Sequence, residues 1–404
     1  MWTRVVAAAA CFAAIMGFSR LAYGVLVPAI QHSLGGGYAL YGAIGAANLF
    51  GYFVGTLGAT RLAARHDRAH SNAGALVAMC AAMAASALVR DPLQLGLLRF
   101  AVGAASGVAL ALTLSLAVEG VSPARRGLAA AIVWGGGALG IALVGAVPLG
   151  WSTQWRAEWL AMALAGVACA AVFAWLTGRS NQAAPARVHA NAGGAVFGRD
   201  YLPLTVAYFA FGFGYIDLVT FLGASLARTH GLPPGTVWIV LGTTGVAGAA
   251  VWGPVVDRFR SGLPVAVACG LCAAGALLLA LGSPSAALIG SLAVGVSFIG
   301  VPAMVGALVQ QRERPAHYAG TFAAVTAVLA CGQVLGPLVG GFAAERLGTP
   351  AALYVAAAAL AVAASLAAAY RAPARVRPAR LENRLAERGE DQADREFGRA
   401  VALV

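Results

Sequence analysis

The fold of this chain is decided by the stretch from Val5 to Gln31, which reads VVAAAACFAAIMGFSRLAYGVLVPAIQ. As a helix rising ~1.5 Å per residue, this stretch is long enough to cross the ~30 Å hydrocarbon core of a bilayer. Its only charged residue is Arg20, near the position of the bilayer midplane. A charge at that depth costs several kcal/mol, so it indicates a partner or a water-filled cavity.

Apolar stretches of this kind recur along the whole chain. The protein has 404 residues, of which 60% are hydrophobic and only 10% charged, a composition typical of membrane proteins. The 52 glycines suit helices that approach one another closely. We therefore expect an all-α membrane protein with about twelve transmembrane helices in two pseudo-symmetric six-helix bundles, near residues 5–31, 38–63, 72–89, 92–118, 128–150, 159–177, 201–226, 236–256, 263–282, 285–309, 318–343 and 351–370.

The longest break between apolar stretches runs from Thr177 to Arg199 and is polar and rich in Gly, Ala and Pro. It separates six stretches from six, as a flexible linker between two bundles would. The expected parts are an N-terminal bundle, a cytoplasmic linker, a C-terminal bundle and a charged cytoplasmic tail, at residues 1–177, 178–199, 200–370 and 371–404.

The two halves show a weak internal repeat with two possible registers. Thr60-Arg61 aligns with Asp257-Arg258 at an offset of 197 residues, and the same offset places Arg20 on Asp217. A shift of two residues, which matches the Gly-Phe pairs of the two halves, places Arg20 on Tyr215 instead. Six-helix halves repeated in parallel orientation are a transporter architecture.

Arginines between the apolar stretches indicate the orientation in the membrane. If the N-terminus is cytoplasmic, thirteen arginines fall in cytoplasmic segments and eight in the tail, against four on the other side. This positive-inside bias predicts that both termini are cytoplasmic, and the same distribution of the net charge of +12 argues against nucleic acid as a partner. The first four arginines of the tail would contact anionic lipid headgroups. Trp151, Trp155 and Trp159 flank one short connection, as an interfacial aromatic belt would.

Three short motifs resemble those of the major facilitator superfamily. They are Gly253-x-x-x-Asp257-Arg258 after the eighth apolar stretch, Arg99-x-x-x-Gly103 in the fourth, and Gly332-x-x-x-Gly336-Pro337-x-x-Gly340-Gly341 in the eleventh. The first stretch, with Gly17-Phe18-Ser19-Arg20 and Tyr23, resembles a bacterial branch of that superfamily. The resemblance covers the chain except the tail, and implies a secondary transporter of the bacterial inner membrane.

The resemblance also implies roles for particular residues. Arg99 corresponds to a superfamily residue linked to proton coupling, although helix packing is the alternative. Gly253, Asp257 and Arg258, with Arg61 of the first half, correspond to a conformational switch at the helix ends. Thr60 stands where the first-half motif has an acid, which puts the first-half copy of this switch in doubt.

Helical spacing directs several polar and aromatic residues toward one central cavity. The expected substrate-binding residues are Arg20, Tyr23, Asn48, Tyr52, Phe213 and Gln333. Arg20 would anchor an anionic group, since guanidinium pairs well with carboxylate; the alternative is a structural ion pair with Asp217. Asp217, the only acid placed deep in the membrane, would carry a proton and neutralise Arg20 until a substrate anion displaces it, or be a fixed structural acid.

The sequence contains no nucleophile elbow, phosphate-binding loop or metal-ligand spacing, so we expect neither an enzyme nor a cofactor or metal site. The resulting hypothesis is a monomeric secondary transporter of a small organic solute, favouring an organic anion, driven by protons in symport. Two alternatives stay open: proton-driven efflux of amphipathic compounds, and a non-transporting membrane sensor on the same scaffold.

Overall fold

The computed structural model describes residues 1–122, 125–146, 154–178, 201–227, 231–259, 261–313 and 315–371, together with Gly198 and Thr229. Within these ranges the protein is helical. The helical segments are α1 (Trp2–Phe12), η1 (Ala13–Leu21), α2 (Ala22–Leu34), α3 (Tyr38–Arg65), α4 (Arg68–Ser86), α5 (Pro92–Val118), α6 (Arg126–Ala146), α7 (Trp155–Thr177), α8 (Leu202–Leu226), α9 (Pro234–Phe259), α10 (Leu263–Ala280), α11 (Pro284–Phe298), α12 (Gly300–Arg312), α13 (Pro315–Leu347) and α14 (Thr349–Ala369).

Eleven helices of the described chain are long and apolar enough to cross a membrane. The segments α1, η1 and α2 form one such helix from Trp2 to Leu34, and α11 and α12 form another from Pro284 to Arg312. The helix α4, with 19 residues, is not among the eleven and makes twelve with them. The predicted all-helical membrane fold is confirmed.

Glycines let the helices α3 and α5 approach each other until their backbones touch. A Cβ added to Gly51 or Gly55 of α3 would overlap the backbone of α5, and one added to Gly103 or Gly107 of α5 would overlap the backbone of α3. Because lipid offers no hydrophobic drive for helix association, such contact through small residues is what holds membrane helices together. The glycines of the motif that begins at Arg99 therefore serve to pack α5 against α3.

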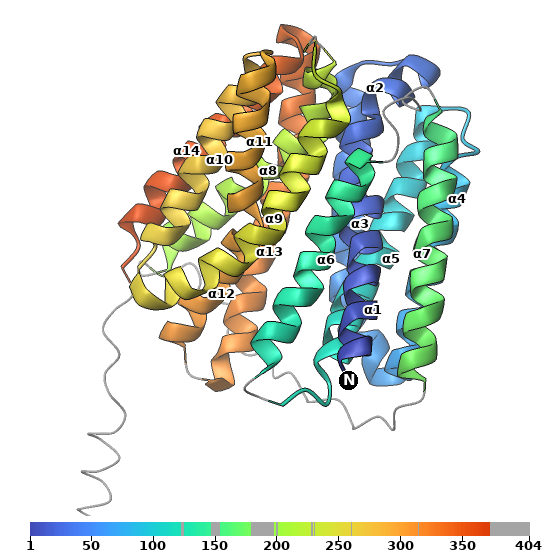
Figure 1. Cartoon of the computed structure of the whole chain (residues 1–404), viewed down its shortest axis with the longest axis vertical. Helices are drawn as coiled ribbons and strands as arrows, with labels where there is room; N and C mark the ends of the chain where they lie inside the picture. The colour runs from blue at the N-terminus through green and yellow to red at the C-terminus, as the bar shows by residue number, and fades with distance from the viewer. Residues whose placement is uncertain are drawn as a thin grey trace, which may run out of the picture. The chain divides into compact units, whose positions relative to one another are not determined.

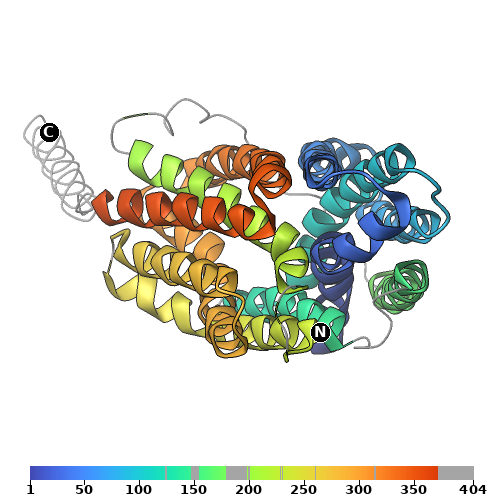
Figure 2. The ribbon, with the colours of Figure 1, turned by 90° about the horizontal axis from the view of Figure 1, so that it is seen from above.

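The helices α1–α7 meet the helices α8–α14 along three pairs, in which α2 contacts α8, α3 contacts α13 and α6 contacts α9. Figure 1 shows α2 at the end of the molecule opposite the N-terminus. Seen from above, the blue-to-teal helices lie on one side and the yellow-to-red helices on the other, with α6 against α9 (Figure 2). At the pair α2–α8, Gly24 lies against Val219, and Gly223 lies against the Gly24 carbonyl.

The first long helix is irregular in its middle. Residues Ala13–Leu21 form a π-helix, in which the Ala22 N–H donates to the Gly17 carbonyl five residues earlier. Pro28 lies inside α2 and has no N–H to donate to the Gly24 carbonyl. π-Helical turns are rare in proteins, and those that occur often lie at functional sites. The position of Arg20 near the end of η1 therefore makes it a candidate functional residue.

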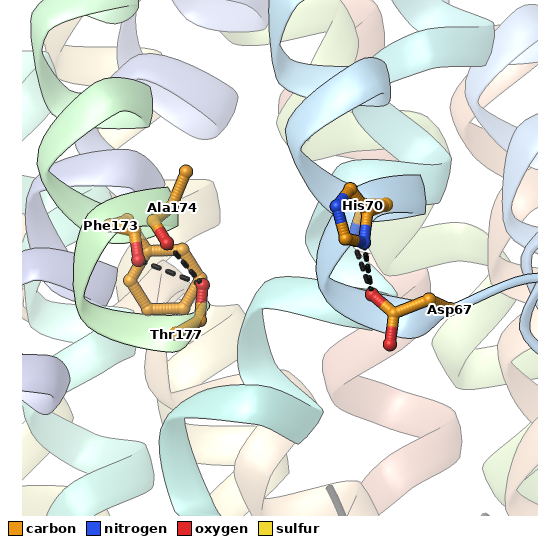
Figure 3. A network of polar contacts seen from close by, with 5 residues as sticks. All are labelled: Asp67, His70, Phe173, Ala174 and Thr177. Carbon is orange, nitrogen blue, oxygen red and sulfur yellow. Dashed lines mark hydrogen bonds and ion pairs between the residues drawn. The ribbon is translucent and has the colours of Figure 1, made fainter. Parts of the chain in front are cut away.

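The ends of two helices are closed by side-chain oxygens (Figure 3). At the start of α4, the Asp67 carboxylate accepts a 2.8 Å hydrogen bond from the His70 N–H, and this bond lowers the pKa of Asp67 below its usual value. At the end of α7, the Thr177 hydroxyl donates to the Phe173 and Ala174 carbonyls, at 2.9 and 3.2 Å. Both devices satisfy backbone groups that a helix end leaves unpaired.

The tryptophans do not form the predicted interfacial belt. Trp155 and Trp159 are 1% and 0% exposed, so they lie in the protein interior rather than at its lipid-facing surface. Trp151 lies outside the described residues. The prediction failed because helix α7 turns this face toward Arg99, which lies over the Trp159 ring at 5.2 Å.

Candidate substrate-binding site

Arg20 lies in the interior, with 7% of its surface exposed, and all its partners are neutral. Its Nη2 atom donates to the Gln333 Oε1 atom at 3.5 Å, and its Nη1 atom lies 3.6 Å from the Met16 sulfur. Its guanidinium carbon sits 4.3 Å from the centre of the Tyr52 ring. The Nε atom has no hydrogen-bond partner. Arg20 is therefore a buried cation that no carboxylate of the described residues neutralises.

Arg99, on α5, is a second buried cation close to the first. It is 1% exposed, and its Nη1 atom donates to the Ser19 carbonyl of η1 at 2.7 Å. The guanidinium also lies over the rings of Tyr23 and Trp159, at 4.8 and 5.2 Å from their centres. Arg99 thus holds the backbone next to Arg20, and the rings around it stabilise its charge.

A cavity of about 300 Å³, part of which is open space, lies beside the two arginines. Residues from both halves of the chain line it, from η1, α2, α3 and α5 of the first half and from α8 of the second. Its lining residues are Arg20, Leu21, Tyr23, Gly24, Gly45, Asn48, Leu49, Arg99, Ile216, Val219 and Thr220.

Five of the six predicted substrate-binding residues lie at or beside this cavity. Arg20, Tyr23 and Asn48 line it, while Tyr52 and Gln333 contact the Arg20 guanidinium. Two of these side chains are already engaged with backbone carbonyls: the Tyr23 hydroxyl donates to Tyr41 at 2.8 Å, and the Asn48 amide donates to Arg99 at 2.9 Å. These bonds orient the cavity wall.

Phe213, the sixth predicted residue, lies where α8 packs on α13. A Cβ added to Gly336 would overlap the Phe213 carbonyl, and one added to Gly332, one turn earlier, would overlap the Phe209 carbonyl and lie 3.0 Å from the Phe213 nitrogen. The same face of α8 carries Asp217, and a Cβ added to Gly340 would overlap its carboxylate. Phe213 and Asp217 therefore lie in a contact with the glycines of α13, whereas Thr220, which helical spacing places on the same side of α8, lines the cavity.

Asp217 does not pair with Arg20 in this structure. Asp217 is 0% exposed, and neither carboxylate oxygen has a hydrogen-bond partner among the described residues. The residue of α8 that does approach Arg20 is Tyr215, whose hydroxyl accepts from the Gln333 Nε2 atom. Arg20, Gln333 and Tyr215 thus form a chain of hydrogen bonds across three helices.

A second pocket, lined mainly by apolar and aromatic side chains, shares the lining residue Leu21 with the first. It holds about 450 Å³ of empty space, part of it open to the surroundings. The sequence analysis missed it, since its aromatic residues come from helices far apart in the chain and carry no polar signal. Its lining residues are Met16, Leu21, Trp134, Gly137, Ala138, Ile141, Phe211, Tyr215, Phe298, Ile299 and Pro302.

Residues 12–368 match the family described as the uncharacterised MFS-type transporter YbfB, MFS being the major facilitator superfamily. This chain belongs to that family. The predicted resemblance is thereby confirmed, and with it the conclusion that the protein is a multi-pass membrane transporter and not an enzyme. None of the curated proteins matches the sequence.

Solved structures of other transporters share the fold of this MFS-type protein. A variant of the nucleoside transporter NupG superposes with a TM-score of 0.72 at 14% identity, over 91% of this chain and 98% of that one. A bacterial homologue of the human lysosomal transporter Spinster, inward-facing and unoccupied, superposes with a TM-score of 0.69 at 17% identity, over 91% of this chain and 96% of that one. At such identities the likeness shows the fold alone.

The residues predicted to form the conformational switch of this MFS-type protein lie at helix ends. Arg61 and Arg258 are exposed, near the ends of α3 and α9. Gly253 and Asp257 belong to α9, but the structure describes only their backbone. Arg258 lies in the last turn of α9 and is not among the residues that line the cavity.

The cysteines and acids of this MFS-type protein form no metal centre within the described residues. All six cysteines carry free thiols, four of them buried. Cys269 and Cys272 lie one helical turn apart and are buried in α10, where they pack as small apolar side chains.

Proposed function

We propose that this protein is a secondary active transporter that carries a small organic anion across the bacterial inner membrane, by alternating access and coupled to protons. The observation that supports it is Arg20, a buried guanidinium whose contacts are an amide oxygen, a thioether and an aromatic ring. A buried charge without an opposite charge is costly, and a substrate carboxylate would supply the missing partner.

A substrate carboxylate could readily replace the neutral partners of Arg20. A hydrogen bond of 3.5 Å to Gln333 and a sulfur at 3.6 Å are long contacts, which an incoming carboxylate can replace at little cost. Arg99, held by the Ser19 carbonyl, adds positive potential to the same cavity. Two arginines and no acid facing this space favour an anion over a cation or a neutral solute.

Alternating access is supported by where the two halves touch. Gly24 of α2 meets Gly223 of α8, and Gly42, near the start of α3, meets Gly341 of α13. The Glu345 carboxylate also accepts a 2.8 Å hydrogen bond from the Ala39 N–H at the start of α3, which joins α13 to the other half. These contacts would close one side of the site, and rocking of the halves would break them.

Asp217 is the proposed proton carrier, with Arg99 assisting through the potential of the cavity. An ionised carboxylate without a partner is expensive to bury, so we propose that Asp217 holds a proton while α8 lies against Gly340. It would release that proton when α8 and α13 separate. The direct competition with substrate for Arg20 requires a different conformation, in which α8 turns.

Orientation and assembly are part of the same proposal. The arginine bias between the spans supports cytoplasmic termini, and the basic start of the tail, at residues 371–380, suits anionic headgroups. A monomer in the lipid bilayer suffices, since the cavity is formed within one chain. The division into bundles at residues 1–177 and 200–370, with a linker at 178–199, remains a prediction.

The first test is a ligand screen by thermal stability on the purified full-length protein, comparing wild type with Arg20→Ala. A ligand that binds only the folded state stabilises it by an amount set by its concentration over its dissociation constant. Carboxylates are expected to raise the Tm of the wild type and to leave the variant unchanged. If carboxylates shift both proteins equally or neither, the anion-transporter proposal is wrong.

Efflux of amphipathic compounds is the second candidate function, favoured by the apolar pocket between Trp134 and Phe298. It predicts that uncharged or cationic amphipathic compounds stabilise wild type and Arg20→Ala alike. A flux assay in vesicles separates both candidates from a non-transporting sensor, which would bind a ligand without moving it.

A further inference from the structure

We propose that the substrate is an aromatic carboxylate, whose anionic group binds Arg20 and whose ring occupies the apolar pocket beside it. This inference rests on the proposed function and names the chemical class of the anion. Its basis is the geometry of two adjoining spaces, one lined by arginines and the other lined entirely by apolar and aromatic side chains.

The two spaces share one lining residue, and two further residues link the second space to Arg20. Leu21 lines each of them, directly after Arg20 in the chain. Met16 lines the apolar pocket, and its sulfur contacts the Arg20 guanidinium at 3.6 Å. Tyr215 lines the pocket with its ring, and its hydroxyl joins Arg20 through Gln333. A ligand bound to Arg20 would therefore have its apolar part directed into the second space.

Aromatic rings form one wall of the apolar pocket. Phe211 and Tyr215 stack with their ring centres 4.9 Å apart and an angle of 19° between the planes. Phe298 continues this row, 6.2 Å from Tyr215. Aromatic pairs of this kind prefer offset-stacked or edge-to-face geometries, which a further ring can extend. The wall thus suits a flat ring better than a flexible alkyl chain.

Small residues on α6 form another part of the pocket wall. Gly137 and Ala138 line the pocket next to Trp134, and a Cβ on Gly137 would press against Met16. Trp134 belongs to the helices α1–α7, whereas Phe211 and Phe298 belong to α8–α14. A ring between these walls would touch both halves, so its binding would bear on the movement between them.

The test compares the dissociation constants of acetate, benzoate and benzyl alcohol for the full-length protein. Acetate offers the carboxylate alone, benzyl alcohol the ring alone, and benzoate both. We expect benzoate to bind at least about tenfold more tightly than acetate, because the pocket removes the ring from water. Benzyl alcohol should bind more weakly than benzoate, and Arg20→Ala should remove the difference between these two ligands.

A matched pair of variants assigns the effect to the pocket. Phe298→Leu removes a ring from its wall, while Phe342→Leu makes the same change at an exposed position of α13. Only Phe298→Leu should lower the benzoate-to-acetate preference, by several-fold, with acetate binding unchanged. The wild-type comparison needs no variant, so it decides the inference even if Phe298→Leu does not fold.

The outcomes separate this inference from the function on which it rests. If acetate binding depends on Arg20 and benzoate binds no more tightly than acetate, the proposed anion transport is supported. The inference that the anion is aromatic is then overturned. If Phe342→Leu lowers the preference as much as Phe298→Leu, the pocket is not the ring site and the inference is overturned. If neither carboxylate binds, the proposed function fails together with it.

Discussion

Arg20 and Asp217 are two buried ionisable residues, a base and an acid, each on the first long helix of its half, yet their surroundings differ completely. Arg20 faces a cavity and has neutral partners in reach; Asp217 faces Gly340 of α13 and has none. The first helix contains the π-helix η1, whereas α8 is a regular α-helix over Leu202–Leu226. Because a wider turn rotates the residues that follow it, residues aligned by sequence need not share a face.

The largest effect is expected at Arg20. Replacement by Ala should lower the rate of anion uptake into proteoliposomes at least about 100-fold, corresponding to ~3 kcal/mol, because the substrate carboxylate loses its charged partner. Arg20→Lys should retain part of the rate, as Lys keeps the charge but not the planar fork. Arg90→Ala, at an exposed position, is the control. Equal rates in Arg20→Ala and Arg90→Ala would show that Arg20 is structural.

The second prediction concerns Asp217, the acid of this pair, and its proposed role as proton carrier. Asp217→Asn keeps the shape of the side chain and removes its titration, so a proton carrier would lose its function without loss of fold. We expect uptake driven by an imposed pH gradient to stop, while exchange of substrate across the membrane continues. Undiminished accumulation in Asp217→Asn would make Asp217 a fixed structural acid.

Gly340 tests the contact that separates Asp217 from Arg20. A Cβ at Gly340 would overlap the Asp217 carboxylate, so Gly340→Ala should destabilise the protein by ~1–3 kcal/mol, measured by thermal unfolding. Gly270→Ala is the matched control, since nothing lies within 4 Å of its added Cβ in α10. Adding Asp217→Ala to Gly340→Ala should recover part of the loss. Simple additivity of the two changes would contradict the contact.

The sequence was sufficient for the helical spans and for the position of Arg20, since hydropathy and a single buried charge are local signals. It also placed Asn48 and Gln333 near Arg20, because helical spacing at regular segments is reliable. It could not show that the glycines of α13 draw Asp217 and Phe213 away from the cavity, because this depends on which helix packs against α8.

The two repeat registers illustrate the same limit. The offset of 197 pairs Arg20 with Asp217, and the shifted register pairs it with Tyr215. In the structure Tyr215 is the residue linked to Arg20, through Gln333. The apolar pocket escaped prediction for a related reason: Trp134, Phe211 and Phe298 lie on three helices, and only their packing makes them neighbours.

The smallest effect concerns Asp67, an exposed acid that contrasts with Asp217 because backbone donors stabilise its charge. The His70 N–H donates to it at the start of α4 and holds its pKa below the usual value.

A carboxyl group whose pKa is lower in the folded protein than in the unfolded chain stabilises the fold. That contribution is fully present at pH values above the pKa in the unfolded chain, about 3.9, and it is lost as the pH falls through the pKa in the folded protein. Asp67→Ala should therefore cost ~1 kcal/mol near neutral pH, with the difference from wild type narrowing in acid. Asp67→Asn keeps the capping oxygen without the charge, so its stability should change less with pH over the same range. A cost of Asp67→Ala that does not vary with pH would mean that the capping geometry, and not the charge, stabilises this helix end.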